Sequence, residues 1–294
     1  MRSGFVSIIG RPNVGKSTLL NALIDTKVAI TSDKAQTTRN IIQGIYNEPE
    51  TQIVFVDTPG IHKPVNKLGK ILNKQSYSLT KDVDAILLVV DAKEGLGKGD
   101  KYIISSLDKN SVPVILVLNK IDRMTTSELM SRINEYKDLF AFADIVPVSA
   151  LKKDNIERLI KVVKEYLTDN VKYFDDDIYT SNSVKFMISE IVREKLLNVT
   201  SEEVPHSITC YCTKYDDKET IIHINVDIIV DRESIKKIVI GKKGDRLKEI
   251  GIKSRVEIEH LVGKQVYLDL FVKVVKNWKD KEKYLSELGF TDFE

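Results

Sequence analysis

The chain has 294 residues, of which 42% are hydrophobic, and its formal net charge is +2 at pH 7. This length predicts two domains, and the composition is that of a soluble globular protein with enough apolar residues for real cores. No run approaches the roughly 18 apolar residues that a membrane-spanning helix needs. Two cysteines, Cys210 and Cys212, are poorly placed to bridge each other, and so few thiols fit a reducing, cytoplasmic compartment.

Residues 5–167 alternate apolar runs of strand length with amphipathic helical stretches. The expected strands are Val6–Ile9, Gln43–Tyr46, Gln52–Asp57, Ala85–Asp91, Val112–Asn119 and Asp144–Ser149. The expected helices are Ser17–Asp25, Lys67–Leu79, Lys98–Leu107, Thr126–Leu139 and Ile156–Leu167. Such alternation predicts an α/β domain with a mostly parallel sheet covered on both faces.

A polar stretch then interrupts the pattern. It contains Asp175-Asp176-Asp177 and, soon after, Thr180-Ser181-Asn182-Ser183. We interpret residues 1–170 as the first domain, 171–183 as a linker and 184–294 as the second domain. The three aspartates would alternatively form a metal cluster, but a solvated linker is favoured.

The second domain has a different order of elements: helix, strand, strand, helix, helix, strand. The segments are Val184–Asn198, Ser207–Tyr215, Thr220–Val230, Arg232–Val239, Asp245–Leu261 and Gln265–Val275, with a last helix at Lys279–Leu288. The loop Gly241-Lys242-Lys243-Gly244 separates the two consecutive helices. This order predicts an α+β domain.

The most informative motif is Gly10-Arg11-Pro12-Asn13-Val14-Gly15-Lys16-Ser17, which reads G-x-x-x-x-G-K-S. It lies between an apolar strand and a helix that continues with Thr18, which is the context of a phosphate-binding P-loop. Backbone N–H groups of the loop and of the helix N-terminus point at an anion in such a motif. We expect the segment from Gly10 to Thr18 to bind a nucleotide, with Lys16 at the β- and γ-phosphates and Ser17 on Mg²⁺.

Further motifs stand where predicted strands end, at the edge where α/β sheets bind ligands. Asp57-Thr58-Pro59-Gly60 places an aspartate that holds Mg²⁺ through water and a glycine N–H for the γ-phosphate. In Asn119-Lys120-Ile121-Asp122, Asp122 can accept hydrogen bonds from guanine N1–H and N2–H₂, a donor pair that adenine lacks. In Ser149-Ala150, the Ala150 N–H can donate to guanine O6. These motifs in this order predict GTP rather than ATP.

The polar segment 30–39 stands in the position of a first switch, where a threonine closes on Mg²⁺ and the γ-phosphate. The Thr37-Thr38 doublet is ambiguous, and we favour Thr38. The metal ligands are then Ser17, Thr38 and Asp57. The residues expected to support hydrolysis are Lys16, Thr38, Gly60 and Asn13.

Hydrolysis is expected to be slow without assistance. Ile61 follows the second motif at the place where small signalling GTPases carry a water-orienting glutamine. His62 is adjacent, but it is a poor candidate for a base because a loop residue there need not face the phosphate. Asn13 either helps to hold K⁺ near the phosphates, in place of an arginine finger, or only shapes the loop.

The loop Gly241-Lys242-Lys243-Gly244 fits the G-x-x-G loop of a KH domain, which clamps the backbone of about four nucleotides. From Ile235 to Lys283 there are 14 Lys/Arg against 7 Asp/Glu, a net charge of +7, whereas Val171 to Ser234 has 7 against 13, a net charge of −6. The basic charge is therefore concentrated around this loop, as in an RNA-binding footprint. We expect the loop and Arg246 to contact RNA. The apolar residues nearby predict a groove for bases: Ile238, Val239, Ile240, Ile250, Ile252 and Ile258.

Taken together, the chain resembles the Era family of bacterial ribosome-assembly GTPases over nearly its whole length. The segments that carry the resemblance are Gly10–Ser17, Gln36–Arg39, Asp57–Pro64, Asn119–Asp122, Val148–Leu151, Ile191–Leu196 and Ile240–Ile252. The resemblance implies a P-loop GTPase domain followed by a type II KH domain. It also implies binding near the 3′ end of 16S rRNA, a role on a precursor of the small (30S) subunit, and peripheral association with the cytoplasmic face of the cell membrane. We expect a monomer.

Two other functions compete with this one. In the first, the protein is a signalling GTPase in cell-cycle control with a protein or membrane partner; the local basic cluster argues against it. In the second, it is a passive RNA-binding protein with a vestigial nucleotide site; the intact motifs argue against that.

Overall fold

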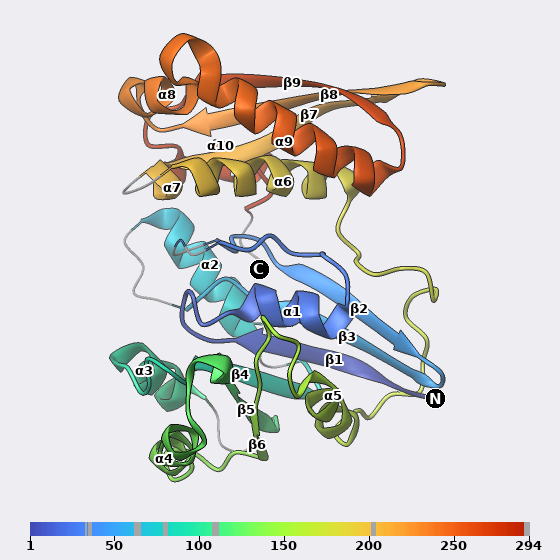
Figure 1. Cartoon of the computed structure of the whole chain (residues 1–294), viewed down its shortest axis with the longest axis vertical. Coiled ribbons are helices and arrows are strands. Elements are labelled where there is room, and N and C mark those ends of the chain that lie inside the picture. The colour runs from blue at the N-terminus through green and yellow to red at the C-terminus, as the bar shows by residue number, and fades with distance from the viewer. Residues whose placement is uncertain are drawn as a thin grey trace. The chain divides into compact units, whose positions relative to one another are not determined.

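The computed structural model describes residues 1–32, 34, 37–61, 66–78, 82–107, 112–200 and 204–290. The chain folds as two compact units (Figure 1). Among the described residues, the first unit contains those up to Ser181 except 66–68, and the second contains 66–68 and those from Asn182 on. Each unit has its own sheet. None of the helices in these described ranges is long and apolar enough to cross a membrane.

In the described part of the first unit, six strands form one sheet in the order β2-β3-β1-β4-β5-β6. Their bounds are β1 Arg2–Ile9, β2 Ile42–Glu48, β3 Thr51–Asp57, β4 Ala85–Asp91, β5 Val114–Asn119 and β6 Asp144–Pro147. β2 runs antiparallel to β3, and the other neighbours are parallel. The parallel strands therefore bring their carboxyl ends to one edge, and with them the motifs that follow.

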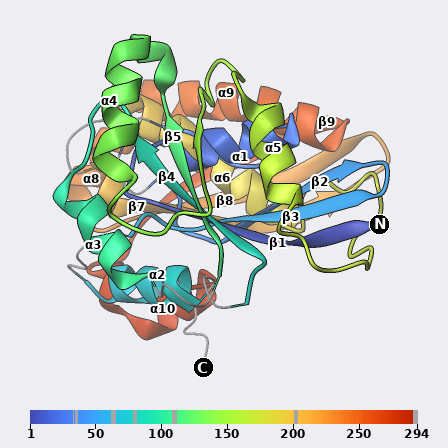
Figure 2. The ribbon, with the colours of Figure 1, turned by 90° about the horizontal axis from the view of Figure 1, so that it is seen from below.

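Helices cover both faces of this sheet, as the sequence predicts (Figure 2). Their bounds are α1 Lys16–Ile24, α2 Lys67–Ser78, α3 Lys98–Ser106, α4 Thr126–Tyr136 and α5 Ile156–Lys164. α1 packs on β2, β3 and α5, whereas α3 and α4 bury Ile103, Ile104 and Tyr136 against residues of β4 and β5. Every residue of β3, β4 and β5 is buried, which explains their continuous apolar runs.

The element limits differ from prediction mainly at the ends. β6 stops at Pro147 because Ser149 has already turned to pair with Asp154, through main-chain bonds of 3.1 and 3.0 Å. The helices predicted to end at Leu139 and Leu167 end earlier. The predicted end of α2 at Leu79 lies outside the described residues.

Residues 173–181, within the predicted linker, lie along the edge strand β2 (Figures 1 and 2). The Ile45 N–H donates to the Tyr179 carbonyl at 2.9 Å. Gln52, at the start of β3, donates to the Phe174 carbonyl at 2.8 Å. These bonds cover an edge that would otherwise be open to pairing with another chain.

In the described part of the second unit, three strands form a sheet in the order β7-β8-β9, with β7 antiparallel and β9 parallel to β8. The bounds are α6 Val184–Val199, α7 Val204–Ser207, β7 Ile208–Asp217, β8 Ile221–Val230, α8 Glu233–Ile240, α9 Asp245–Val262, β9 Gln265–Val274 and α10 Glu282–Glu287. The short α7 was not predicted; the other elements follow the predicted order. α6 and α9 pack against each other and against the sheet. Val226 of β8 and Ile250 and Ile258 of α9 are fully buried.

Candidate functional site

The P-loop follows β1 directly and ends in the first turn of α1. Gly15 has φ +97°, a conformation that glycine adopts without strain, and a Cβ there would come within 2.4 Å of Asn119 Nδ2. Lys16 is 6% exposed, and its Nζ donates to the carbonyls of Gly10 (3.2 Å) and Arg11 (2.9 Å). Burial lowers the pKa of Lys16 to about 8. A buried cation on a glycine loop is suited to an anionic ligand.

Three oxygen ligands meet beside the loop, and they are the residues predicted to bind Mg²⁺. Ser17 Oγ lies 2.7 Å from Thr38 Oγ1 and donates to Asp57 Oδ2 at 2.7 Å. The Thr38 hydroxyl is 3.4 Å from the same carboxylate oxygen, whereas Thr37 Oγ1 donates to the Lys34 carbonyl. The geometry thus brings Thr38, not Thr37, to the cluster.

The cluster fits a Mg²⁺ ion. Its donors are all oxygens, the ligands that Mg²⁺ prefers. Asp57 is fully buried, and its Oδ1 has no hydrogen-bond partner among the residues that the structure describes. Burial raises the pKa of Asp57 to about 6, although the Lys16 charge and the hydroxyl bonds act in the opposite direction. A bound cation would satisfy the orphaned oxygen and favour the ionised carboxylate.

We predict that Asp57→Asn stabilises the protein in the absence of Mg²⁺ and nucleotide. The folded-state pKa of about 6 exceeds the ordinary 3.8, so the folded form is favoured by the protonated acid. That contribution is full below about pH 4 and is lost as pH rises through about 6. At pH 7 the neutral amide avoids a cost of up to about 3 kcal/mol.

Thermal unfolding of wild type and Asp57→Asn between pH 4 and pH 8, without Mg²⁺ and nucleotide, checks this. The difference in melting temperature is expected to be small at pH 4 and to favour the variant increasingly up to about pH 6. A variant that melts below wild type at pH 7 contradicts the prediction.

The residues predicted to recognise the base converge at the ends of β5 and β6. Asn119 Nδ2 donates to the Val14 carbonyl at 2.8 Å and ties β5 to the P-loop. Asp122, in the short 3-10 helix Ile121–Arg123, accepts from Ser149 Oγ at 2.5 Å. The Ala150 N–H donates to Asn119 Oδ1 at 3.0 Å, so its donation to a base stays a prediction. The two motifs thus form one connected corner next to the phosphate loop.

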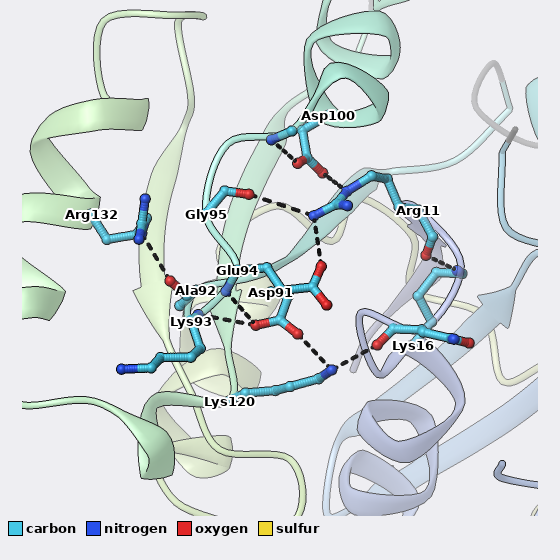
Figure 3. Close-up of polar contacts among 12 residues, drawn as sticks. Arg11, Lys16, Asp91, Ala92, Lys93, Glu94, Gly95, Asp100, Lys120 and Arg132 are labelled. Carbon is cyan, nitrogen blue, oxygen red and sulfur yellow. Dashed lines mark hydrogen bonds and ion pairs between the residues drawn. The ribbon is translucent and has the colours of Figure 1, made fainter. Parts of the chain in front are cut away.

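Lys120 connects this corner to the P-loop a second time. Its Nζ donates to the Asn13 carbonyl at 2.7 Å and lies 2.6 Å from Asp91 Oδ2 (Figure 3). Asn13 has φ +65° and lines the hollow between the P-loop and the switch segment, together with Lys16 and Thr38. Its position is therefore close to the predicted phosphate site, as required by either interpretation of Asn13.

The segment after β3 closes the other side of the P-loop. Thr58 Oγ1 donates to the Ile8 carbonyl at 2.9 Å, and the Pro59 carbonyl accepts from Ser76 Oγ at 2.9 Å. Gly60 lies so close to Pro12 that a Cβ would approach its N to 2.9 Å. Ile61 is 2% exposed and belongs to the core, so it cannot orient water. The candidate base His62 lies outside the described residues.

Arg11, which the motif places among the nucleotide-binding residues, directs its side chain away from the P-loop. Its Nε donates to Asp100 Oδ1 at 2.8 Å, on α3 (Figure 3), and nucleotide binding by its main chain stays a prediction. Asp91 and Asp100, which hold Lys120 and Arg11, were not predicted as site residues. Little in the sequence indicates their roles: Asp91 is an aspartate at the end of a strand, and Asp100 follows two glycines.

In the second unit, the G-x-x-G loop forms a tight turn between α8 and α9. Gly241 and Gly244 have φ +76° and +85°, and a Cβ at Gly241 would lie 2.7 Å from Arg246 Cβ. Lys242 and Lys243 are exposed, whereas Arg246 donates from Nη1 to the Ile238 carbonyl at 2.5 Å. The loop thus presents its two lysines, and Arg246 supports its shape.

A groove runs from this loop between α9 and β9. Its lining residues are Gly244, Leu247, Lys248, Gly251, Ile252, Arg255, Val266, Tyr267, Leu268 and Leu270. The predicted groove was partly wrong, since Val239, Ile250 and Ile258 are fully buried in the core and only Ile238 and Ile252 are exposed. In a helix of 3.6 residues per turn, Ile250 and Ile258 share the buried face, whereas Ile252, two residues after Ile250, faces outward. The prediction missed the lining residues of β9, which no local motif links to the loop, and also Leu247, Lys248 and Arg255 of α9.

Two family models match the chain: one described as 50S ribosome-binding GTPase over residues 5–120, and one described as KH domain over residues 203–279. The chain is similar to a solved structure of a variant of Aquifex aeolicus Era bound to GDP·AlF₄⁻, at 42% identity, covering 99% of this chain and 100% of that one, with a TM-score of 0.95. It is also similar to Era in complex with MgGDPNP and nucleotides 1506–1542 of 16S ribosomal RNA, at 41% identity, with 99% of both chains covered and a TM-score of 0.94.

The fold and the site define a P-loop GTPase with a C-terminal KH domain. At this identity and coverage, the chain belongs to the Era family of GTPases, which confirms the resemblance and the fold class drawn from its motifs.

Proposed function

We propose that the protein binds and hydrolyses GTP with Mg²⁺, binds RNA near the 3′ end of 16S rRNA through its KH domain, and acts in small-subunit assembly. The observation that carries the proposal is the meeting of Ser17, Thr38 and Asp57 beside Lys16, in one chain with the exposed G-K-K-G loop. The solved Era structures with GDP·AlF₄⁻, and with MgGDPNP and 16S rRNA nucleotides, support it.

Within the nucleotide site, Ser17, Thr38 and Asp57 would hold Mg²⁺, which neutralises phosphate charge when bound. Lys16 and the P-loop N–H groups bind the phosphates, and Gly60 offers its N–H to the γ-phosphate. Asn119, Lys120 and Asp122, with Ser149 and Ala150, select guanine. In the KH domain, Lys242 and Lys243 meet phosphates, and the groove between α9 and β9 receives bases.

Filter binding tests the combined function. The full chain is titrated against an oligonucleotide of the 16S 3′ end, with a GTP analogue and separately with GDP, and phosphate release from GTP is followed in parallel. We expect saturable RNA binding that responds to the nucleotide. Absence of RNA binding in both states contradicts the RNA half of the proposal, and absence of phosphate release contradicts the GTPase half.

Hydrolysis is proposed to be slow and dependent on K⁺. The buried Ile61 stands at the position where a glutamine would orient water, and Asn13 lines the hollow where a cation would neutralise phosphate charge. Turnover is expected well below the range of about 1–100 s⁻¹ found for kinases. Exchanging K⁺ for Na⁺ should slow it, and Asn13→Ala should remove the difference. A wild-type rate indifferent to K⁺ contradicts the potassium role.

The remaining proposals concern the cellular location, the partner, the oligomeric state and the domain bounds. The protein is proposed to act as a cytoplasmic monomer on a 30S precursor, with peripheral contact at the inner face of the cell membrane. Residues 1–170 are proposed as the GTPase domain and 184–294 as the KH domain, joined by 171–183. Co-sedimentation with 30S particles, membrane flotation and analytical ultracentrifugation test partner, membrane contact and oligomeric state separately.

A further inference from the structure

The Arg11 side chain leaves the P-loop and enters the turn between β4 and α3 (Figure 3). Its Nε donates to Asp100 Oδ1 at 2.8 Å, and its Nη2 lies 3.5 Å from the Gly95 carbonyl and 3.4 Å from Glu94 Oε2. Asp100 is 1% exposed, whereas Glu94 is mostly exposed. The bond to Asp100 is therefore the interaction least screened by water.

The turn is shaped to receive this arginine. A Cβ at Gly99 would lie 2.5 Å from Arg11 Cδ, and one at Gly97 would lie 3.3 Å from Arg11 Cζ. Asp100 is held as well, because its Oδ2 accepts from the Gly97 N–H at 2.8 Å. Glycine allows close approach because it has no Cβ, and here the arginine side chain occupies the space that a Cβ would fill. We call residues 94–100 the arginine socket.

The same turn holds the P-loop at a second point. Asp91 Oδ2 pairs with Lys120 Nζ at 2.6 Å, and that ammonium donates to the Asn13 carbonyl at 2.7 Å. Asp91 Oδ1 in turn accepts from the N–H groups of Lys93 and Glu94 at 3.0 and 3.1 Å. The P-loop is thus held through the Arg11 side chain and through the Asn13 carbonyl, on either side of Pro12. The P-loop is therefore fixed at two points within the segment that is predicted to bind phosphate.

We propose that Arg11 is a positioning residue for nucleotide binding: by bonding to Asp100 in the arginine socket, it keeps the P-loop main chain in its phosphate-binding shape. This rests on the proposed GTP-binding function. We call the bond between Arg11 and Asp100 the latch. It acts on the loop and not on the γ-phosphate, so its loss weakens GTP and GDP binding by similar factors. Without this bond, part of the free energy of nucleotide binding is lost to ordering the loop.

A double-mutant cycle tests the latch. Fluorescent mant-GDP and mant-GMPPNP are titrated against wild type, Arg11→Ala, Asp100→Asn and the double variant, well below each melting temperature. We expect each single variant to bind both nucleotides about tenfold more weakly, and the double variant to be little worse than either single one. Arg11→Lys, which keeps charge but not the planar fork, is expected to lie in between. The matched control is Lys164→Ala, which breaks an ion pair with Glu48 elsewhere in the same unit and should leave affinity unchanged.

The outcomes are separable. Wild type that binds neither probe overturns the proposed function, and the latch with it. Wild-type binding with unchanged affinity in Arg11→Ala overturns the latch alone. Losses that add fully in the double variant also overturn it, because Arg11 would then act without Asp100. If Arg11→Ala does not fold, the cycle of Arg11→Lys with Asp100→Asn decides by the same criteria, since a purely structural role lowers the melting temperature without this coupling in affinity.

Discussion

Asp122→Asn is expected to change the nucleotide preference of the protein from guanine to xanthine. Asp122 Oδ1 accepts from Ser149 Oγ at 2.5 Å, and an amide oxygen can keep that bond. The amide N–H₂ then takes the place of a carboxylate oxygen, so it donates where guanine also donates. Losing charge-assisted hydrogen bonds of about 1.5–3 kcal/mol each weakens GTP binding by on the order of 100-fold. Xanthine carries a carbonyl at the same position and recovers the lost interaction.

Competition between GTP and XTP for the wild type and the variant measures this change. Asp154→Asn is the matched control, because Asp154 is an exposed carboxylate in the loop after β6, and its main chain pairs with Ser149. It should leave the preference for GTP intact. An Asp122→Asn protein that still prefers GTP by the wild-type factor would remove Asp122 from base recognition. Equal loss of GTP and XTP binding would instead indicate that the substitution disrupts the local structure at the ends of β5 and β6.

Much of the GTPase fold was predictable because its strands are buried on both faces. β4 was predicted with its observed limits, Ala85–Asp91, since a continuous apolar run bounded by a charged residue leaves little choice. The motifs that follow β1, β3 and β5 were predictable for a related reason. Parallel strands have their carboxyl ends at one edge of the sheet, so residues that follow those ends, such as Lys16, Asp57 and Asp122, are expected at the same edge.

Sequence reasoning missed two kinds of polar contact: contacts between segments far apart in the chain, and contacts between charged residues buried within one helix. Arg11 and Asp100 are 89 positions apart, and nothing local indicates that one side chain enters the turn before the other. In α6, Arg193 pairs with Glu190 at 2.5 Å although both are nearly fully buried, whereas such residues usually face water. The segment 173–181 is polar, so its sequence predicts a solvated linker. Its main-chain bonding to β2 leaves no trace in the sequence, because main-chain hydrogen bonds do not depend on side-chain type.

The double variant Lys242→Asp, Lys243→Asp is expected to lose RNA affinity by at least about 100-fold while keeping its fold and its GTP affinity. Both lysines are exposed. Lys243 has φ +53°, a region that aspartate enters more readily than most residues, so the turn should survive. Single-stranded RNA binding depends on salt with a slope of about 0.7 per phosphate neutralised, so the slope should fall by about 1.4 if each lysine neutralises one phosphate.

RNA binding across a salt series and GTP affinity on the same preparation check both parts of this expectation. The matched control is Lys214→Asp, Lys218→Asp, which makes the same change in charge at the β7–β8 turn, at the opposite end of β8 from the helix that leads into the loop. Both of its lysines are exposed and lie near Asp216. If RNA is attracted only by the net charge of the unit, both double variants weaken binding equally. If the G-K-K-G loop clamps the backbone, only the loop variant loses salt-dependent affinity, because only there do two phosphates lose their partners. A loop variant with the wild-type slope would make the loop a simple turn and would remove the main support for RNA binding at this groove.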